Sequence, residues 1–448
     1  MTVTKTIHAL SLFLFVSLVV PNAFAAPFAP LHRADFDNGV QLVVEEDHSA
    51  PVAIVQVWLK VGGRDEVPGK TGLAHVFEHM MFKGSKRLDA GEFSRRIAAM
   101  GGTDNAFTSH DYTAYFEIVP AAKVDMVLDM EAERFGHLRL RKEDFAKEIR
   151  VIQEERRMRT DDDPNSRMFE ELSSVALRLH PYRAPVIGWM QDLKSLTIDD
   201  VRAFYKQHYI PGSATVVVVG DVDFEDVKKT VARTFGKLKK RPVPERFNPV
   251  EPEPIGPKRM TATLPAQLPM LAVTMPVPVW HPGENDREAA ALAVATEILA
   301  GGRSALLNRE IVDKQRKAFA ASAGYDPFSM GIDLWFAYGM LGPKQTPEGF
   351  EKALWTTIDA LRDAGPGAAQ LAAAKRRMIA DQVYAQDSLY IRAKQIGSME
   401  AVGIGADKRD DWLSALGKVS AEDVQKVLKQ WIRPARSTTG LLQPEVKS

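Results

Sequence analysis

Apolar runs of strand length alternate along this chain with stretches in which apolar residues recur at helical spacing. Val52–Val61 and Leu271–Val279 are apolar runs that each lead into a helical pattern. Two further pairs of segments, one in each half of the chain, predict a helix followed by strands: Phe93–Met100 with Tyr112–Val119, and Asn308–Lys314 with Ile332–Gly339. Together these patterns predict an α+β fold whose sheets are mainly antiparallel.

The second half of the chain repeats the plan of the first half. The sequences TIDDVRAFYKQHYIP at 197–211 and SAEDVQKVLKQWIRP at 420–434 share Asp-Val, Lys-Gln and Pro at a constant offset of 223 residues. Thr215 matches Thr438 at the same offset. Both segments open with Thr or Ser ahead of acidic residues, which is typical of a helix start. A repeat this long indicates duplicated domains, because solenoid repeats are far shorter.

A proline-rich segment separates the two halves. Its sequence is KKRPVPERFNPVEPEPIGP, at residues 239–257. The prolines are incompatible with a helix and with a central strand, so the segment predicts an extended linker. We therefore expect two homologous α/β-sandwich domains, each a mainly antiparallel sheet with helices, at residues 26–238 and 258–448. Two similar domains on such a tether could close around a ligand.

Residues 1–25 predict a cleaved export signal. Lys5 precedes the apolar run Ala9–Val20, and Ala23-Phe24-Ala25 supplies small residues at the two positions that a signal peptidase reads. The alternative is an uncleaved membrane anchor, but the run is shorter than the roughly 20 residues that span a bilayer. We expect cleavage after Ala25 and a periplasmic or secreted protein without a stable membrane anchor.

Charge and composition narrow the chemistry. Lys and Arg together number 58, as do Asp and Glu, so the formal net charge is zero and nothing favours nucleic acid as a partner. Cysteine is absent, which excludes disulfides, thiolate ligands and cysteine nucleophiles.

The segment TGLAHVFEHMMFKG, at residues 71–84, is largely apolar except for three groups that a helix would place on one face. His75 and His79 lie one turn apart, with Glu78 beside them. Burying such groups unpaired would be costly. Two imidazoles at this spacing bind zinc, and the carboxylate can hold a metal-bound water and take its proton. Zinc then needs a third protein ligand, which leaves the fourth position for water.

The best source of a third ligand is the helical pattern AKEIRVIQEERRMR at residues 146–159. Arg150 and Glu154 are expected on a solvent-exposed face, where they can pair. The predicted inward stripe consists of Glu148, Val151, Ile152 and Glu155. An inward carboxylate needs a cation, so we expect Glu155 to be the third ligand and Glu148 to orient a ligand or water.

These residues resemble the site of the inverted zinc metallopeptidases of the pitrilysin/insulinase family, and most closely that of bacterial chains similar to mitochondrial processing peptidase. The resemblance spans nearly the whole mature chain, including VGGRDE at 61–66, KG at 83–84, GGTDNAFTSHDYTAYF at 101–116 and HPYRAPVIG at 180–188. It implies a clamshell of two α+β domains that closes on an unfolded peptide. It also implies that His75, His79 and Glu155 bind Zn²⁺ and that Glu78 is the general base.

The resemblance also implies a peptide-binding strand. Asn105, Ala106, Phe107 and Thr108 match the edge strand of the family, which pairs with the substrate backbone. Such a strand offers unpaired N–H and C=O groups to any extended peptide. The alternative is a strand already covered by another strand. His110, in a polar loop, is expected to be a hydrogen-bonding surface residue, and His180 is expected to be structural.

The second domain lacks the metal site. Leu292, Ala295 and Thr296 occupy the positions that match the two histidines and the glutamate of the motif. Met378 occupies the position that matches the third ligand. We therefore expect one metal-binding domain and one without metal.

The family resemblance further implies an arginine and a tyrosine in the second domain, which bind the substrate carbonyl and stabilise the oxyanion. Here Ala305 stands at the arginine position and Phe319 at the tyrosine position. In some bacterial relatives, one chain holds zinc and a zinc-less chain supplies this pair. We therefore expect a heterodimer with a homologous zinc-less chain. A self-sufficient enzyme, with Arg303 or Tyr325 as donors after a small shift in register, is the alternative.

The leading interpretation is a zinc endopeptidase subunit that hydrolyses short unfolded peptides in the periplasm. One alternative is a non-catalytic peptide-binding or scaffold subunit of a larger complex, although such chains usually lose zinc ligands. A zinc-storage protein is a third interpretation, but it would carry exposed His-rich tracts, and the sequence has none.

Overall fold

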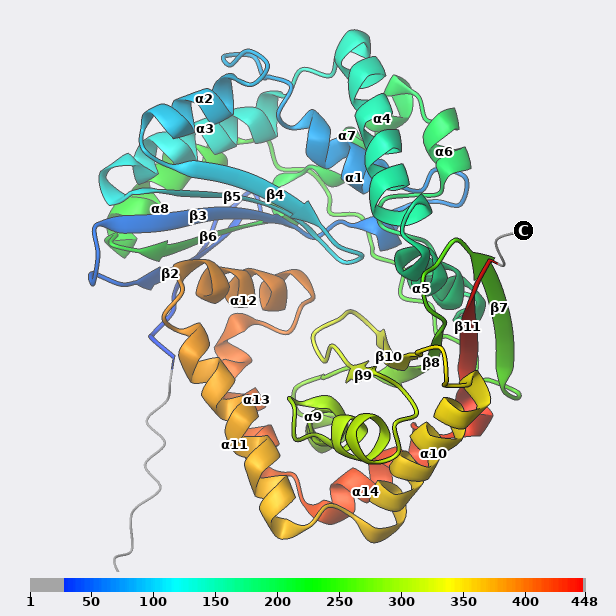
Figure 1. The fold of residues 1–448 in the computed structure, drawn as a ribbon. Helices are drawn as coiled ribbons and strands as arrows, with labels where there is room; N and C mark the ends of the chain where they lie inside the picture. Colours follow the sequence, from blue (N-terminus) through cyan, green and yellow to red (C-terminus); the bar gives the residue numbers. More distant parts are fainter. Residues whose placement is uncertain (1–27, 446–448) are drawn as a thin grey trace, which may run out of the picture.

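The computed structural model describes residues 28–445, which form two halves, each built on one β-sheet with helices packed against it (Figure 1). The predicted export signal, residues 1–25, lies outside the described residues. No helix between residues 28 and 445 is long and apolar enough to cross a membrane.

The first sheet has the strand order β1-β2-β6-β3-β5-β4. Its strands are β1 (His32–Asp35), β2 (Gln41–Glu46), β3 (Val52–Leu59), β4 (Thr103–Thr108), β5 (Thr113–Pro120) and β6 (Ala214–Gly220). Neighbouring strands are antiparallel except for β2 and β6, which are parallel. Strands β3 and β6 lie in the middle of the sheet and are buried almost throughout, which explains their continuous apolar sequences.

The second sheet has the order β7-β11-β8-β10-β9. Its strands are β7 (Lys258–Leu264), β8 (Met270–Pro278), β9 (Ala320–Gly324), β10 (Ile332–Met340) and β11 (Thr438–Pro444). This is the order of the last five strands of the first sheet, and β7 and β11 form the matching parallel pair. The predicted α+β class with mainly antiparallel sheets is confirmed, and the two halves share one topology.

Fourteen α-helices surround the sheets within the described part of the chain. The first half contains α1 (Leu73–Met80), α2 (Glu92–Ala99), α3 (Val124–His137), α4 (Lys142–Arg156), α5 (Pro164–Ala176), α6 (Met190–Ser195), α7 (Ile198–His208) and α8 (Phe224–Arg233). The second half contains α9 (Asp286–Ala300), α10 (Pro347–Ala364), α11 (Ala368–Ala385), α12 (Leu389–Ala401), α13 (Arg409–Lys418) and α14 (Ala421–Gln430). The helix predicted at 308–314 is π-helical, over Leu307–Lys314.

The two copies of the repeat begin their last helix in the same way. At the starts of α7 and α14, the hydroxyls of Thr197 and Ser420 accept hydrogen bonds from the backbone N–H groups of Asp200 and Asp423. The two aspartates accept from the backbone of the cap residues in return. These capping boxes stabilise both helix starts and explain why this part of the repeat is clearest in the sequence.

One helix of each half also packs against the sheet of the other half. Helix α5 of the first half packs on β7, β8 and β11, whereas α12 of the second half packs on β3 and β6. The contacts are close: a Cβ added at Gly397 of α12 would lie 1.9 Å from the ring of Trp58, and one at Gly440 of β11 would lie 2.2 Å from Met168 of α5. One apolar core therefore spans both halves.

Buried ion pairs hold α12 in place. Glu45 of β2 is fully buried, and its carboxylate lies 3.4 Å from a guanidinium nitrogen of Arg392 and 3.0 Å from one of Arg409. Arg392 also pairs with Asp47. Removing any partner would leave a buried charge uncompensated, so these pairs favour one docking position for α12.

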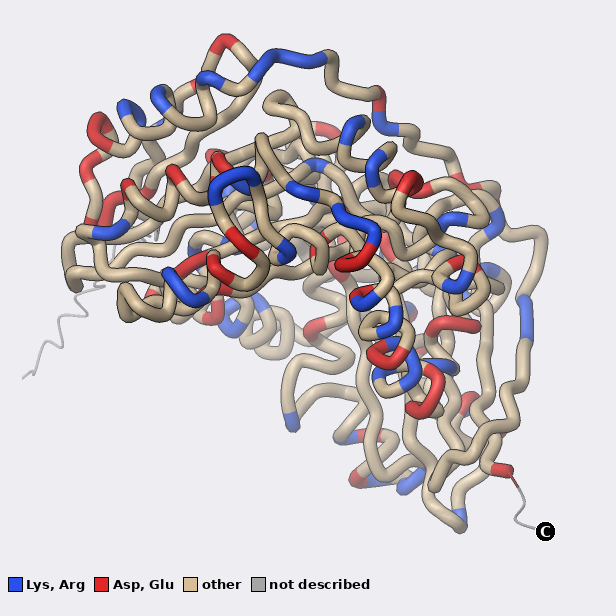
Figure 2. The backbone as a smooth tube through the Cα atoms, turned by 90° about the horizontal axis from the view of Figure 1, so that it is seen from above, with Lys and Arg blue, Asp and Glu red and all other residues tan. Residues whose placement is uncertain are grey.

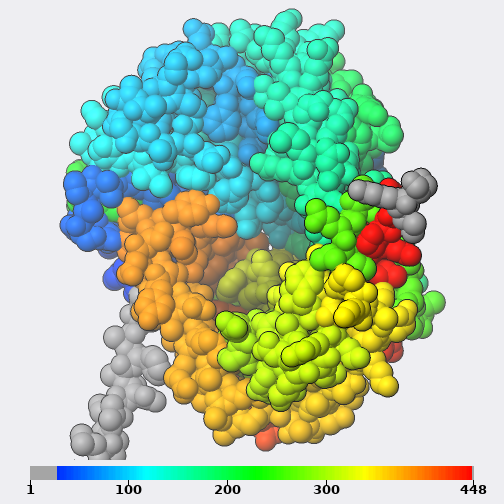
Figure 3. All heavy atoms as spheres, viewed as in Figure 1, coloured from blue at the N-terminus to red at the C-terminus, as the bar shows by residue number. Residues whose placement is uncertain are grey.

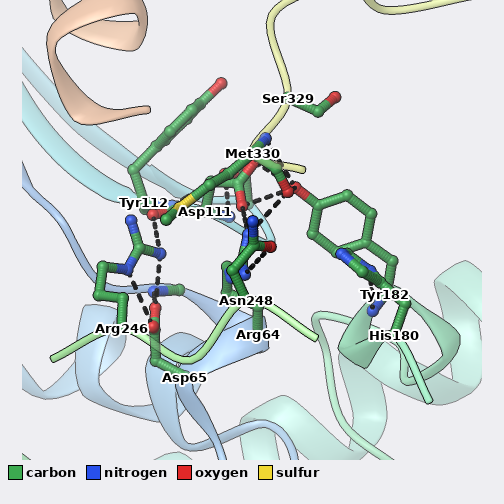
Figure 4. Close-up of polar contacts among 12 residues, drawn as sticks. Arg64, Asp65, Asp111, Tyr112, His180, Tyr182, Arg246, Asn248, Ser329 and Met330 are labelled. Atoms are coloured by element: carbon green, nitrogen blue, oxygen red, sulfur yellow. Dashed lines mark hydrogen bonds and ion pairs between the residues drawn. The ribbon is translucent and has the colours of Figure 1, made fainter. Parts of the chain in front are cut away.

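The predicted linker, residues 239–257, contains no helix or strand and is tied to both halves by a polar network (Figure 4). Arg64 donates to the carbonyls of Phe247 and Met330, at 2.8 Å each. The carboxylate of Asp111 accepts from the Tyr182 hydroxyl at 2.6 Å and from the Met330 backbone at 3.1 Å. The network joins loops of the first half, the linker and the turn before β10, so it fixes how the halves meet.

Basic and acidic residues are interspersed over the molecule, as Figure 2 shows. The surface is hollowed between the two halves (Figure 3).

The close contact between α12 and β3 yields a stability prediction. We expect Gly397→Ala to lower the free energy of unfolding by about 1–3 kcal/mol, because the added methyl group overlaps the ring of Trp58. Gly417→Ala in α13 is the matched control: nothing lies within 4 Å of its added Cβ, and alanine there should stabilise the helix by roughly 0.5–1 kcal/mol. Thermal unfolding of both variants tests this, and a Gly397→Ala variant as stable as the parent would contradict the docking described here.

Candidate metal centre

Helix α1 carries the histidines and begins without a side-chain cap of its own. Gly72, at its N-terminus, adopts the left-handed conformation with φ 89°. The Glu66 carboxylate accepts hydrogen bonds from the backbone N–H groups of Gly72 and Ala74, at 2.8 and 2.7 Å. Burial raises the pKa of Glu66 to about 8, although these two bonds act in the opposite direction. A residue outside the helix thus satisfies two of the backbone donors at the helix start.

The two histidines lie one above the other on the least buried edge of α1. The other face of the helix is buried through Leu73, Ala74, Val76, Phe77 and Met80. The ring centres of His75 and His79 are 4.9 Å apart. Their side chains are 11% and 21% exposed, so both rings are largely buried but open to a ligand from one side.

Helix α4 supplies the glutamates, but it is rotated from its predicted orientation. Val151 was predicted to point inward and is instead 49% exposed. The buried face is centred on Phe145, Ile149 and Ile152. Because successive residues on a helix are about 100° apart, Glu148 and Glu155 then lie at the edge of that face, with Val151 beyond it.

Glu154 and Glu155 have different environments, although they are adjacent. The side chain of Glu154 is 64% exposed and pairs with Arg157, not with Arg150 as predicted. The side chain of Glu155 is 16% exposed and faces the two histidines.

Three side chains converge where the edges of α1 and α4 meet. Glu155 Oε1 lies 3.8 Å from His75 Nε2, and Glu155 Oε2 lies 3.4 Å from His79 Nε2. One ligand-type atom from each of these residues lies within 4.8 Å of the others. It is the one such group of three residues among residues 28–445. Two imidazoles and a carboxylate are a common zinc donor set, so the residues fit this metal.

Glu148 lies behind the centre. Its Oε2 is 3.3 Å from His79 Nδ1, and its Oε1 is 2.7 Å from Lys83 Nζ. This contact orients the ring so that His79 Nε2 faces Glu155. Such a carboxylate–imidazole contact also makes the ring a stronger ligand.

Burial sets the protonation of the centre. It lowers the pKa of His75 to about 3, with smaller contributions from His79 and Arg159, so this imidazole is neutral near pH 7. The neutral ring is the form that binds metal. Burial raises the pKa of Glu78, while a 2.5 Å hydrogen bond donated by the Thr108 hydroxyl opposes the shift.

The predicted substrate strand, residues 105–108, is the end of β4 and lies at the edge of the first sheet. Among the described residues, β4 pairs only with β5, so its other edge is not covered by a strand. Thr108, its last residue, holds the carboxylate of Glu78. The edge strand therefore ends beside the candidate metal centre.

His110 and His180 do not join the centre. His110 is half-buried, not on the surface as predicted, because its ring packs on Tyr182 and its Nε2 lies 3.0 Å from the Ala184 carbonyl. His180 is fully buried, and its Nδ1 accepts from the Tyr182 backbone at 3.4 Å, consistent with a structural role.

The matching face of α9 in the second half holds no ligand set. Thr296 donates its hydroxyl proton to the Leu292 carbonyl at 2.8 Å and accepts from the indole N–H of Trp335 at 2.9 Å. Ala295 is buried, and Met378 packs against the apolar core. The one polar group at these positions is thus satisfied within the protein.

The positions expected to carry an arginine and a tyrosine offer no side-chain donor. Ala305 is buried and Phe319 is 51% exposed. Of the two residues that could replace them, Tyr325 donates its hydroxyl proton to the Pro278 carbonyl at 2.7 Å, and Arg303 is exposed. Tyr325 is therefore engaged elsewhere in this structure.

Sequence reasoning missed three contacts of the centre: Glu66 at the start of α1, Thr108 on Glu78, and Arg159, which pairs with Glu155 Oε1 at 2.7 Å. Glu66 lies in the VGGRDE stretch, and the match of that stretch to the family was the sequence signal that could have identified it.

Comparisons with known proteins agree with this arrangement. The family profile described as "Insulinase (Peptidase family M16)" matches residues 41–188, and that described as "Peptidase M16 inactive domain" matches residues 195–378. The zinc protease PqqE of Helicobacter pylori is 31% identical over 98% of this chain and 99% of its own length.

Solved structures share the fold. A protease from Helicobacter pylori superposes with a TM-score of 0.86 at 29% identity, over 93% of this chain and all of that one. The periplasmic protease PqqL from Escherichia coli superposes with a TM-score of 0.78 at 18% identity, over 92% of this chain but only 47% of its own, which is a likeness of fold alone. Given two family profiles that together cover most of the chain and a relative that aligns with nearly all of it, this protein belongs to peptidase family M16, the pitrilysin/insulinase family.

Proposed function

We propose that this protein is a zinc-dependent endopeptidase that hydrolyses short unfolded peptides. One observation supports the proposal above all: His75, His79 and Glu155 converge beside Glu78, and Glu78 is hydrogen-bonded to the end of an open edge strand. A peptide that pairs with β4 would pass directly over this group of side chains.

The chain's own residues have separable tasks in this mechanism. Strand β4 binds the peptide backbone in an extended conformation, with little regard for its sequence. Zn²⁺ held by His75, His79 and Glu155 would supply a Lewis acid that polarises the peptide carbonyl and lowers the pKa of water. The Glu78 carboxylate accepts a proton from the attacking water and can return it to the leaving nitrogen. Glu148 keeps His79 in its ligand orientation.

We further propose that the active form contains a second, homologous chain that lacks zinc and carries the missing arginine and tyrosine. Ala305 and Phe319 support this proposal, since neither can donate a hydrogen bond from its side chain to an oxyanion. The fold likeness to PqqL supports it too, because a body like this one fills about half of that longer chain. Export to the periplasm remains a proposal that rests on residues 1–25.

A non-catalytic peptide-binding or scaffold subunit is the second candidate. The absence of both oxyanion donors favours it, as does the match of residues 195–378 to a profile described as an inactive domain. The complete set of His75, Glu78, His79 and Glu155 argues against it, since a scaffold has no need of a buried base beside three ligands.

Metal content tests the third ligand. We expect Glu155→Gln to weaken zinc binding at least about tenfold, because it removes a charged ligand. Glu154→Gln, one residue away and exposed, should leave the zinc content unchanged. Elemental analysis after dialysis measures both variants, and equal zinc in the Glu155 variant and the parent would refute the assignment.

Hydrolysis tests the base. We expect Glu78→Gln to keep zinc and the fold but to lower the rate of peptide cleavage by about 10²–10⁴-fold or more, because water loses its proton acceptor. The measurement is the cleavage of quenched fluorescent peptides, with zinc content and circular dichroism as controls. A variant that retained most of the activity would exclude Glu78 from this role.

Reconstitution tests the partner. We expect the purified chain, fully loaded with zinc, to cleave peptides poorly. A homologous chain with Arg and Tyr at the positions of Ala305 and Phe319 should raise the rate by about 10²–10³-fold for each donor it supplies. The same partner with both residues changed to Ala and Phe is the control. Strong activity of the single chain, unchanged by any partner, would show that another donor serves.

A further inference from the structure

A π-helical turn directly after α4 places one cation at the candidate metal centre. The turn covers Arg157–Asp161, and π-helical turns of this kind are rare and frequent at functional sites. Its third residue, Arg159, pairs through Nη1 with Glu155 Oε1 at 2.7 Å. Its side chain is 75% exposed. The guanidinium therefore contacts a candidate metal ligand and solvent at once.

The backbone of this turn is held firmly. Arg156, at its start, is buried and donates to the Glu170 carboxylate at 2.7 and 2.9 Å and to the Gly188 carbonyl at 2.8 Å. Arg156 also lies 3.3 Å from the Asp161 carboxylate, so both ends of the turn are tied to one residue. The backbone that carries Arg159 is thus tied at both ends of the turn.

Among the described residues, Arg159 is the one Lys or Arg that pairs with Glu155, and most of its donors are free. Lys83 is paired with Glu148, Arg156 with Glu170, and Arg157 with Glu154. Among the described residues, the Arg159 guanidinium has a single partner, Glu155, which it contacts through one of its three nitrogens.

We propose that Arg159 is a specificity-determining residue that binds a carboxylate of the peptide next to the bond that is cut. The proposal rests on the peptidase function proposed above. A guanidinium presents a planar set of donors that matches a carboxylate, and an exposed one is free to turn toward it. The same exposure makes Arg159 unsuited to stabilise an oxyanion, since that task needs donors fixed in a site without water. The substrates of choice are thus peptides with an acidic group beside the cleaved bond.

Binding without turnover tests the proposal. The zinc-loaded Glu78→Gln protein is titrated with two labelled peptides that differ in one central residue, Glu or Gln, and fluorescence anisotropy gives each Kd. We expect the Glu peptide to bind about three to ten times more tightly, as for one charged hydrogen-bonded pair in an exposed setting. Adding Arg159→Met should abolish this ratio, and Arg159→Lys should keep part of it.

Arg157→Met is the matched control, because Arg157 lies in the same turn but pairs with the exposed Glu154. It should leave the ratio unchanged. A further pair, the Gln peptide with a free or an amidated C-terminus, distinguishes a side-chain carboxylate from the carboxylate of a chain end. Zinc is measured in every variant.

Equal Kd values for all peptides, or loss of zinc from the Arg159→Met protein, would overturn the role of Arg159 and leave the peptidase proposal standing. A protein that binds none of the peptides, and whose parent cleaves none in the presence of a partner, would overturn the peptidase proposal as well.

Discussion

The centre depends on one constraint: a short helix packed into the core carries three polar side chains, and their polar partners come from other elements. Helix α1 has no capping side chain of its own, and its polar edge carries His75, Glu78 and His79. Glu66 caps the helix start, Thr108 donates to the base and Glu148 contacts the second histidine, whereas the buried Nδ1 of His75 has no hydrogen-bond partner among the described residues. Strand β4 and helix α4 supply two of these partners, and losing either would leave a further polar group unpaired in the core.

The two halves form one body because each covers the sheet of the other. Gly397 and Gly440 allow the crossing helices to approach the strands closely, and Glu45 pairs with arginines of the other half. The linker network around Arg64 and Asp111 adds polar contacts at the place where the halves meet. Together these contacts hold the second half in a defined position relative to the centre.

Much of this arrangement could be predicted from local patterns. The central strands β3 and β8 were predicted from apolar runs, the repeat from the matching helix starts at Thr197 and Ser420, and the candidate ligands from helical spacing. Helical spacing distinguished Glu155 from Glu154, and in the structure Glu155 faces the histidines whereas Glu154 is exposed. These features depend on residues close in sequence, so their spacing carries the information.

Other features could not be predicted because they depend on packing between distant segments. The rotation of α4, which exposes Val151, is set by what packs against Phe145 and Ile152. Glu66 lies in a loop without periodicity, so nothing in the pattern connects it to α1. The exchange of helices between the halves, with α5 on the second sheet and α12 on the first, could not be predicted either, because an apolar helix face does not show which sheet it will cover.

That exchange has a consequence for how the molecule can be divided. Helix α5 comes before the linker in the sequence and packs on the second sheet, whereas α12 comes after the linker and packs on the first sheet. The linker itself contains no helix or strand. If a protease cut this linker, the two fragments would stay associated, because α5 would still cover the second sheet and α12 would still cover the first sheet. Either fragment made alone would instead present an uncovered apolar sheet face, a surface prone to aggregation. The linker therefore marks where the halves join in the sequence, but not where the folded molecule could be divided into two stable parts.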